Sequence, residues 1–176
     1  MKSIAIDMDN VIVDVESQYI KWYQQKFGVT VCKEDLMGKP ETEGFPNKEA
    51  VYNFLLTPGF FRTATAIPGA LDAVQTLAAS FQVYIVSAAM EFPQSLIEKY
   101  EWLQQHLPAI SWRNIIFCGD KSIIATDYMI DDHVKNLDTF SGKGVLFTAA
   151  HNINIDRHTR LNDWNEVLDW FAKETM

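Results

Sequence analysis

Two aspartates directly after an apolar N-terminal run constrain this chain more than any other feature. The run is Ile-Ala-Ile at residues 4–6, and Asp7 and Asp9 follow it two positions apart. A continuous apolar run of this kind is typical of a strand buried on both faces of a parallel sheet. A carboxylate at the end of such a strand needs a cation or hydrogen bonds to offset its desolvation. The pattern predicts a site that holds Mg²⁺ while one carboxylate oxygen attacks an electrophile.

The composition indicates one globular domain with a small insertion, and it disfavours one class of partner. The chain has 176 residues, of which 48% are hydrophobic, and a formal net charge of −8. Because no Lys/Arg cluster is present, we expect no nucleic-acid polymer to bind. A small phosphorylated substrate stays compatible with this charge, since one bound Mg²⁺ and one lysine outweigh distant surface acids.

Three sequence features predict a cytosolic protein without a membrane anchor. The two cysteines, Cys32 and Cys118, are too few for a disulfide framework or a Cys-rich metal site. No stretch approaches the ~18 apolar residues that cross a bilayer. The first three residues lead straight into the first strand, which leaves no room for a signal peptide.

Apolar runs alternate with helical patterns along the rest of the chain. Strands are predicted at residues 3–6, 82–86, 114–118, 127–130 and 144–147. Helices are predicted at residues 68–79, 93–106, 133–140 and 164–173. Pro68 and Pro93 stand where first-turn prolines belong. This alternation predicts an α/β fold with a Rossmann-like parallel sheet.

The interval between the first and second strands is far longer than a single crossover helix requires. It contains helical patterns at residues 17–27 and 47–56, separated by a polar stretch at 38–46. We interpret residues 16–65 as a helical cap inserted into a core formed by residues 1–15 and 66–176. Long structured insertions at the carboxyl edge of such sheets often form lids.

Further polar residues follow three of the later strands. Ser87 comes after the second strand, Lys121 follows Asp120 after the third, and the pair Asp131-Asp132 ends the fourth. Taken singly, these residues suit a helix cap, a surface lysine and a helix start. Because open α/β sheets bind ligands at the carboxyl ends of their strands, we expect them to gather with the first two aspartates.

The order of these residues resembles the four motifs of the haloacid dehalogenase superfamily of phosphatases. The matching positions are Asp7-x-Asp9-x-Val11, Ser87, Lys121 and Asp131-Asp132. Longer stretches, covering nearly the whole chain, look like the 5′(3′)-deoxyribonucleotidases. They are DMDNVIVD at 7–14, GFF at 59–61, IPGA at 67–70, EKYEW at 98–102, DKS at 120–122, IDD at 130–132, VLFTA at 145–149 with HN at 151–152, and Leu161-x-x-Trp164.

The resemblance implies a phosphomonoesterase that works through an aspartyl-phosphate intermediate. Asp7 would be the nucleophile, and Asp9 would protonate the leaving oxygen and then take a proton from water. Ser87 would hydrogen-bond a phosphate oxygen. Lys121 would neutralise charge on the nucleophile and on the transferring group.

The same resemblance implies a Mg²⁺ site made only of oxygen ligands. The ligands would be the Asp7 carboxylate, the backbone carbonyl of Asp9 and the Asp132 carboxylate, with Asp131 reached through water. A carboxylate bound directly to Mg²⁺ is a poor proton carrier, so the Asp9 side chain should point away from the metal, towards the cap. Asn10 suits the turn that this requires, because asparagine tolerates turn conformations.

The substrate implied by the resemblance is a nucleoside monophosphate, most closely a pyrimidine deoxynucleotide. Phe60 and Phe61 match a family segment near the nucleobase and are therefore expected to contact the substrate. Val15 replaces a phenylalanine of the family members, Gly119 replaces an arginine, and Ala88-Ala89 replaces a Ser-Pro pair. These departures do not affect the residues expected to transfer phosphate. They leave open which base the substrate carries, and even whether the substrate is a nucleotide.

Two rival functions stay open at this point. One is the same chemistry on another small phosphate ester, such as a sugar phosphate. The other is a non-catalytic protein that binds a phosphorylated metabolite, which the retention of all four motifs disfavours. A homodimer is left open beside a monomer. The purpose expected from the resemblance is deoxyribonucleotide catabolism.

Overall fold

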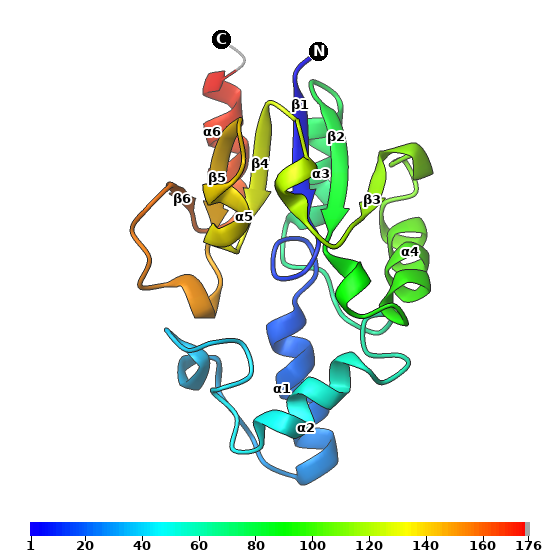
Figure 1. Ribbon diagram of the computed structural model, residues 1–176, viewed down its shortest axis with the longest axis vertical. Helices are drawn as coiled ribbons and strands as arrows, with labels where there is room; N and C mark the ends of the chain where they lie inside the picture. Colours follow the sequence, from blue (N-terminus) through cyan, green and yellow to red (C-terminus); the bar gives the residue numbers. More distant parts are fainter. Residues whose placement is uncertain (175–176) are drawn as a thin grey trace.

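Six parallel strands form one sheet at the centre of the protein, whose computed structural model describes residues 1–174 (Figure 1). Their order across the sheet is β3-β2-β1-β4-β5-β6, which places β1 between β2 and β4. The strands are β1 (Ser3–Asp7), β2 (Gln82–Ser87), β3 (Ile115–Phe117), β4 (Tyr128–Asp131), β5 (Lys143–Phe147) and β6 (Thr159–Leu161). The strands that carry the predicted aspartates and serine are therefore neighbours in the sheet.

Side chains alternate between the two faces of the sheet, and helices cover both faces. Along β1, Ile4 and Ile6 belong to one apolar cluster and Ala5 to the other. The first cluster includes residues of α3 (Ala70–Ala78), α4 (Ser95–His106) and α6 (Trp164–Glu174). The second includes a residue of the short helix α5 (Val134–Asp138). Burial on both faces explains the continuous apolar runs, and the predicted Rossmann-like α/β fold is confirmed.

The long segment between β1 and α3 lies beyond the carboxyl ends of the strands (Figure 1). It contains α1 (Val15–Phe27), a 3-10 turn at Lys33–Leu36 and α2 (Lys48–Leu55). Asp14 and Asn47 cap the two helices, each accepting a hydrogen bond from a backbone N–H three residues on. The apolar interior of this segment is continuous with that of the sheet. The division into a cap at residues 16–65 and a core therefore stays a prediction.

The bounds of most predicted helices and strands agree with the observed bounds to within a few residues, and one strand was not predicted. The helices expected from Pro68 and Pro93 begin two residues later, at Ala70 and Ser95. The omitted strand is β6, whose Thr-Arg-Leu sequence contains no apolar run but pairs in parallel with β5. Among the described residues, no helix combines the length and the apolar character needed to cross a membrane.

Candidate active site

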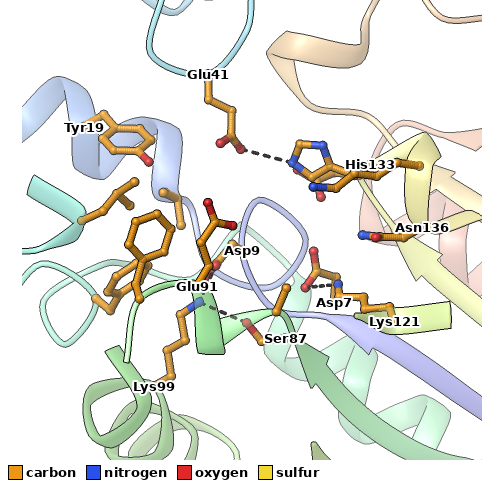
Figure 2. Close-up of a pocket in the computed structure, with 17 residues that line it drawn as sticks. Asp7, Asp9, Tyr19, Glu41, Ser87, Glu91, Lys99, Lys121, His133 and Asn136 are labelled. Atoms are coloured by element: carbon orange, nitrogen blue, oxygen red, sulfur yellow. Dashed lines mark hydrogen bonds and ion pairs between the residues drawn. The ribbon is translucent and has the colours of Figure 1, made fainter. Parts of the chain in front are cut away.

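A pocket opens where the sheet meets the inserted segment, at the carboxyl ends of β1, β2 and β4 (Figure 2). Asp7, Ser87 and Lys121 line it together with Asp9 and Asp132. The structure thus brings together the predicted residues of all four motifs. Asp120 lies outside this group, because its side chain is solvent-exposed and caps the backbone N–H of Ser122.

A tight turn after β1 separates the two aspartates of the first motif. Asp7 is the last residue of the strand, and Asn10 has a positive φ of 54°. The backbone carbonyl of Met8 accepts hydrogen bonds from both Ile12 and Val13. In a straight strand, side chains two residues apart point to the same face. Because the chain turns after Asp7, the side chains of Asp7 and Asp9 can point in different directions. Asn10 occupies the left-handed conformation that asparagine tolerates better than most residues.

Lys121 is held between two buried carboxylates on the floor of the pocket. Its Nζ lies 2.6 Å from Oδ1 of Asp7 and 2.7 Å from Oδ2 of Asp131. Burial disfavours the charged lysine, but the two carboxylates outweigh it and raise its pKa. Burial also raises the pKa of Asp7, to about 6, against the opposing attraction of Lys121. Lys121 is therefore a buried, charged group and not the surface lysine that its sequence context allowed.

Asp131 acts as the anchor of this arrangement. Its carboxylate accepts hydrogen bonds from Lys121, from the backbone N–H of His133 at 2.8 Å and from Nδ2 of Asn136 at 2.9 and 3.0 Å. Both oxygens are therefore already bonded within the protein. These bonds favour a positioning role for Asp131 towards Lys121, and the expectation that Asp131 reaches Mg²⁺ through water stays a prediction. Sequence reasoning missed Asn136, which no motif marked.

Asp132 has the opposite environment, although it is the next residue. It is 1% exposed, and neither carboxylate oxygen has a hydrogen-bond partner among the described residues. Burial, followed by the charges of Asp7 and Asp131, raises its pKa well above the usual range. Its backbone carbonyl accepts a hydrogen bond from Nδ2 of Asn152 at 2.8 Å and lies 3.1 Å from Nε2 of His151. Oδ2 lies 3.8 Å from Nε2 of His151 and 3.9 Å from Nε2 of His133, which is too far for a hydrogen bond. The backbone thus holds the carboxylate in place, and both of its oxygens can still accept a ligand.

These oxygens fit a divalent cation. Ligand atoms of Asp7, Asp131 and Asp132 all lie within 4.8 Å of one another. Since the Asp131 oxygens are bonded elsewhere, Asp7 and Asp132 are the residues suited to direct ligation. Carboxylate oxygens are the donors that a hard cation such as Mg²⁺ prefers. A bound cation would also compensate the two buried oxygens of Asp132.

Asp9 faces another part of the pocket and contacts a residue that sequence reasoning did not single out. Its Oδ2 lies 2.5 Å from Nζ of Lys99, and the same Nζ donates to Oγ of Ser87 at 3.0 Å. Lys99 belongs to α4 and is 2% exposed. A sequence signal did exist, because Lys99 shares a helical spacing with the buried Trp102 and Leu103. A lysine within an apolar stripe needs a buried partner.

The two adjacent phenylalanines of the inserted segment have different positions. Phe61 lines the pocket, with its ring centroid 4.4 Å from Nζ of Lys99. Phe60 is 0% exposed, does not line the pocket and packs on Tyr19 and Trp22 at centroid distances of 5.1 and 5.3 Å. The expectation that Phe60 contacts the substrate is corrected to a role in packing. Tyr19 and Val15 contribute to the pocket wall beside Phe61.

A loop of the inserted segment reaches across the pocket to the sheet (Figure 2). Oε1 of Glu41 lies 3.5 Å from Nε2 of His133 and accepts a hydrogen bond from Nδ2 of Asn10 at 3.2 Å. The imidazole rings of His133 and His151 stack with centroids 4.4 Å apart. These contacts connect the inserted segment to the end of β4. Neither Glu41 nor His133 was assigned a role from the sequence.

Comparisons with known proteins show the family to which this chain is related. The family model of the 5′ nucleotidase, deoxy (pyrimidine), cytosolic type C proteins matches residues 1–175. A Staphylococcus epidermidis protein named "Putative 5′(3′)-deoxyribonucleotidase" is 39% identical, over 96% of this chain and 94% of its own length. A Bacillus subtilis protein named 5′(3′)-deoxyribonucleotidase is 34% identical, over 94% of this chain and 96% of its own length.

Solved structures support the fold alone. A haloacid dehalogenase family hydrolase from Deinococcus radiodurans R1, solved with bound phosphate and sodium, superposes with a TM-score of 0.66. It is 18% identical and covers 99% of this chain and 96% of its own. A haloacid dehalogenase-like hydrolase from Streptococcus pneumoniae has a TM-score of 0.61 at 14% identity, over 97% of this chain and 98% of its own.

Proposed function

This chain belongs to the family of the 5′ nucleotidase, deoxy (pyrimidine), cytosolic type C proteins, and we propose that it is a Mg²⁺-dependent 5′(3′)-deoxyribonucleotidase. Its reaction is the hydrolysis of a phosphate monoester through a phosphorylated Asp7. Its substrates are deoxynucleoside monophosphates, with pyrimidine bases preferred. The family relationship supports the reaction class, while the metal, the intermediate and the base preference are our proposal.

One observation carries the proposal: Asp7 is fixed on the pocket floor by Lys121 at 2.6 Å, beside the carboxylate of Asp132, whose oxygens accept no hydrogen bond from the described residues. Oδ1 of Asp7 also accepts a hydrogen bond from the backbone N–H of Met8 at 2.7 Å. The second oxygen, Oδ2, is therefore the one available to attack phosphorus. A nucleophile held in one orientation gains rate because less freedom is lost on reaching the transition state.

Asp7 and Asp132 would hold the cation, together with the backbone carbonyl of Asp9. When bound, Mg²⁺ supplies positive charge that stabilises the transferring phosphoryl oxygens and offsets the carboxylates around them. Lys121 contributes a second, permanent positive charge on the same floor. Because it already touches Asp7, it needs no rearrangement as charge develops on the phosphoryl group.

The reaction divides into two phosphoryl transfers. In the first, Oδ2 of Asp7 forms a bond to phosphorus, the ester P–O bond breaks, and the leaving oxygen takes a proton from Asp9. In the second, water attacks phosphorus, Asp9 takes its proton, and the bond to Asp7 breaks to release inorganic phosphate. The same carboxyl group thus donates and recovers one proton. Ser87 donates its hydroxyl hydrogen to a phosphoryl oxygen throughout.

The proposed base-binding wall is apolar. Phe61, Tyr19 and Leu55 line the side of the pocket formed by the inserted segment, and Phe92 lies with them. Aromatic side chains suit the flat face of a nucleobase. Glu41, Lys135 and Asn136 line the same pocket, and these polar groups suit sugar hydroxyls. Another small phosphate ester, such as a sugar phosphate, is therefore the alternative substrate.

The test is phosphate release from a panel of deoxynucleotides, ribonucleotides and sugar phosphates, with Mg²⁺ and with EDTA. We expect Mg²⁺-dependent release concentrated on deoxynucleoside monophosphates. Release concentrated on sugar phosphates would keep the reaction and replace the substrate. No release from any ester would contradict the proposed enzyme. Two further expectations stay predictions, namely a cytosolic location and a cap at residues 16–65. The oligomeric state, monomer or homodimer, stays open.

A further inference from the structure

Four side chains that can bind a metal ion meet where the loop of the inserted segment reaches the sheet. They are Glu41, Asp132, His133 and His151, and one ligand atom of each lies within 4.8 Å of the ligand atoms of the others. We refer to these four residues as the histidine cluster. Glu41 belongs to the inserted segment, whereas His133 follows β4 and His151 follows β5. Figure 2 shows Glu41 and His133 facing each other across the pocket.

The distances within the histidine cluster are close to those between the ligands of one bound ion. Nε2 of His133 lies 3.5 Å from Oε1 of Glu41 and 3.9 Å from Oδ2 of Asp132. Nε2 of His151 lies 3.8 Å from the same oxygen of Asp132. Zn²⁺ binds nitrogen and carboxylate oxygen tetrahedrally at about 2.0–2.2 Å, which places neighbouring ligand atoms about 3.3–3.6 Å apart. Shifts of about a few tenths of an ångström would therefore let these atoms surround one ion.

The buried carboxylate of Asp132 is independent evidence for a ligand at this place. It is 1% exposed, and neither of its oxygens accepts a hydrogen bond from the described residues. A buried charged oxygen without a partner is costly. Oδ2 faces both imidazoles, since it is the oxygen nearest to the ligand nitrogens of His133 and His151. Because a carboxylate has two oxygens, Asp132 can bind Mg²⁺ through one of them and a second ion through the other.

The hydrogen bonds of His151 allow its ligand nitrogen to bind an ion. Nε2 of His151 lies 3.1 Å from the backbone carbonyl of Asp132, which also accepts a hydrogen bond from Nδ2 of Asn152. The carbonyl therefore keeps one donor when Nε2 turns towards an ion. Nδ1 of His151 has no hydrogen-bond partner among residues 1–174, so no contact there fixes the tautomer of the ring.

We propose that the histidine cluster is a second cation site, separate from the Mg²⁺ site and suited to Zn²⁺ or a similar transition-metal ion. These ions favour imidazole nitrogen, whereas Mg²⁺ favours oxygen ligands. Two imidazoles and two carboxylates supply the four ligands of a closed tetrahedral site. The inference goes beyond the proposed function and does not depend on it, because it concerns the affinity for a different ion.

An ion in this site would join the inserted segment to the sheet. Its ligands come from the loop that carries Glu41 and from the ends of β4 and β5. Glu41, Asp132 and His133 also line the pocket in which Asp7 lies. A bound ion would therefore hold the loop across the pocket and occupy part of the space beside the proposed Mg²⁺ site.

An explanation without a second metal is that Glu41 and His133 form only an ion pair between the loop and the sheet. In that case His151 has no part in binding Zn²⁺, because its printed contacts are with Asp132 and with the ring of His133. The two explanations therefore differ in whether Zn²⁺ affinity depends on both histidines.

The experiment measures Zn²⁺ binding by calorimetry in excess Mg²⁺, which keeps the oxygen site filled. The samples are the wild type, Glu41→Gln, His133→Gln and His151→Gln. His106→Gln is the matched control, because it removes a histidine at the end of α4, outside the histidine cluster. Circular dichroism establishes which variants are folded. If His151→Gln is not folded, the partly exposed His133 and Glu41 decide the result.

We expect one Zn²⁺ per wild-type chain and an affinity at least about tenfold weaker in each histidine variant. Loss of even an outer partner of a metal ligand usually costs ten- to a hundred-fold, and loss of the ligand should cost no less. Glu41→Gln should weaken binding in the same direction, and His106→Gln should match the wild type. An affinity within about threefold of the wild type in a folded His133→Gln or His151→Gln would overturn the inference, and so would a wild type that binds no Zn²⁺.

Co²⁺ provides a second readout that does not involve activity. Co²⁺ with four nitrogen and oxygen ligands in a tetrahedral site absorbs visible light far more strongly than six-coordinate Co²⁺ in an oxygen site. We expect a strong visible band when Co²⁺ is added to the wild type in excess Mg²⁺, and its loss in His133→Gln. A weak spectrum that is the same in both proteins would place the ion in the Mg²⁺ site and overturn the inference.

These results are separable from the proposed function. Zn²⁺ binding that requires both histidines supports the second site whether or not any phosphate ester is hydrolysed. Hydrolysis of deoxynucleotides by a protein that binds no second ion would keep the proposed enzyme and remove the second site.

Discussion

Nζ of Lys121 lies 2.6 Å from Oδ1 of Asp7, and this contact joins the end of β1 to the loop after β3. The same ammonium lies 2.7 Å from Asp131 at the end of β4, so one lysine ties together two strands and a loop. The contact leaves one oxygen of Asp7 free on the pocket floor. The proposed attack on phosphorus requires that oxygen.

Replacing the proposed nucleophile should abolish turnover without unfolding the protein. In Asp7→Asn the amide keeps the shape of the side chain but is a poor nucleophile, and kcat should fall by on the order of 10⁴-fold or more. Stability should not fall, because the substitution removes a carboxylate from a site crowded with negative charge. Steady-state kinetics and thermal unfolding check the two parts. Asp72→Asn, at a position in the first turn of α3, is the control that should keep full activity.

Removing the carboxylate of Asp132 should chiefly weaken the binding of Mg²⁺. Asp132→Asn should raise the Mg²⁺ concentration for half-maximal rate by at least about tenfold, since a charged ligand becomes a neutral one. Asp120→Asn is the matched control, because Asp120 stands after a neighbouring strand but faces solvent. A Mg²⁺ titration of activity compares them. The same requirement in Asp132→Asn and the wild type would remove Asp132 from the metal site.

The two adjacent phenylalanines should respond differently to truncation. Phe61→Ala should raise KM for a deoxynucleotide more than for a small aryl phosphate, because Phe61 lines the pocket wall. Phe60→Ala should instead destabilise the fold by about 3–5 kcal/mol, the usual cost of truncating a buried phenylalanine. Denaturant unfolding and KM for both substrates check this. If Phe61→Ala weakens the two substrates equally, Phe61 does not contact the base.

Cation binding should depend on pH through the buried carboxyl groups. Burial raises the pKa of Asp7 to about 6 in the absence of metal, and it raises that of Asp132 as well. A carboxyl group whose pKa is raised by folding stabilises the fold while it is protonated, and this contribution is lost as pH rises through the folded pKa. The metal-free protein should therefore lose stability between about pH 4 and pH 6 as Asp7 ionises.

Bound Mg²⁺ should reverse this loss, because it binds only the ionised carboxylates. The rise in Tm on adding Mg²⁺ should consequently be larger at about pH 7.5 than at about pH 5. Differential scanning fluorimetry with and without Mg²⁺ measures both. Asp132→Asn should show a smaller rise at the higher pH. An equal rise at the two pH values would argue against direct ligation by Asp7 and Asp132.

Prediction from the sequence was most accurate for the polar residues that end a strand. At these positions the apolar pattern gives the end of the strand, and the geometry of a parallel sheet gives its neighbours. The Ile-Ala-Ile run before Asp7 predicts both a buried strand and its end, and the strand found is Ser3–Asp7. Ser87 and Asp131 likewise end their strands. Because all these strands are parallel neighbours, their carboxyl ends must meet at one edge of the sheet. This geometry is why a candidate site could be proposed from the sequence alone.

Contacts made by helices and by adjacent residues were harder to predict. Lys99 lies on α4, and its partners depend on how that helix packs beside β2, which no local pattern specifies. Asp131 and Asp132 differ in role because consecutive side chains at the end of a strand point in opposite directions. Phe60 and Phe61 lie in a turn, and they differ because only the Phe61 side chain reaches the pocket. Only tertiary packing distinguishes the member of each pair that faces the pocket.

The central claim, that Asp7 carries the phosphoryl group, has a direct chemical test. The protein is mixed with a deoxynucleoside monophosphate and Mg²⁺, quenched during turnover and treated with borohydride, which reduces an acyl phosphate to an alcohol. Peptide mass spectrometry then locates the reduced residue. We predict reduction at Asp7 that requires substrate and is absent from Asp7→Asn. Active turnover with no reduced residue at Asp7, or with reduction at another carboxylate, would contradict the account.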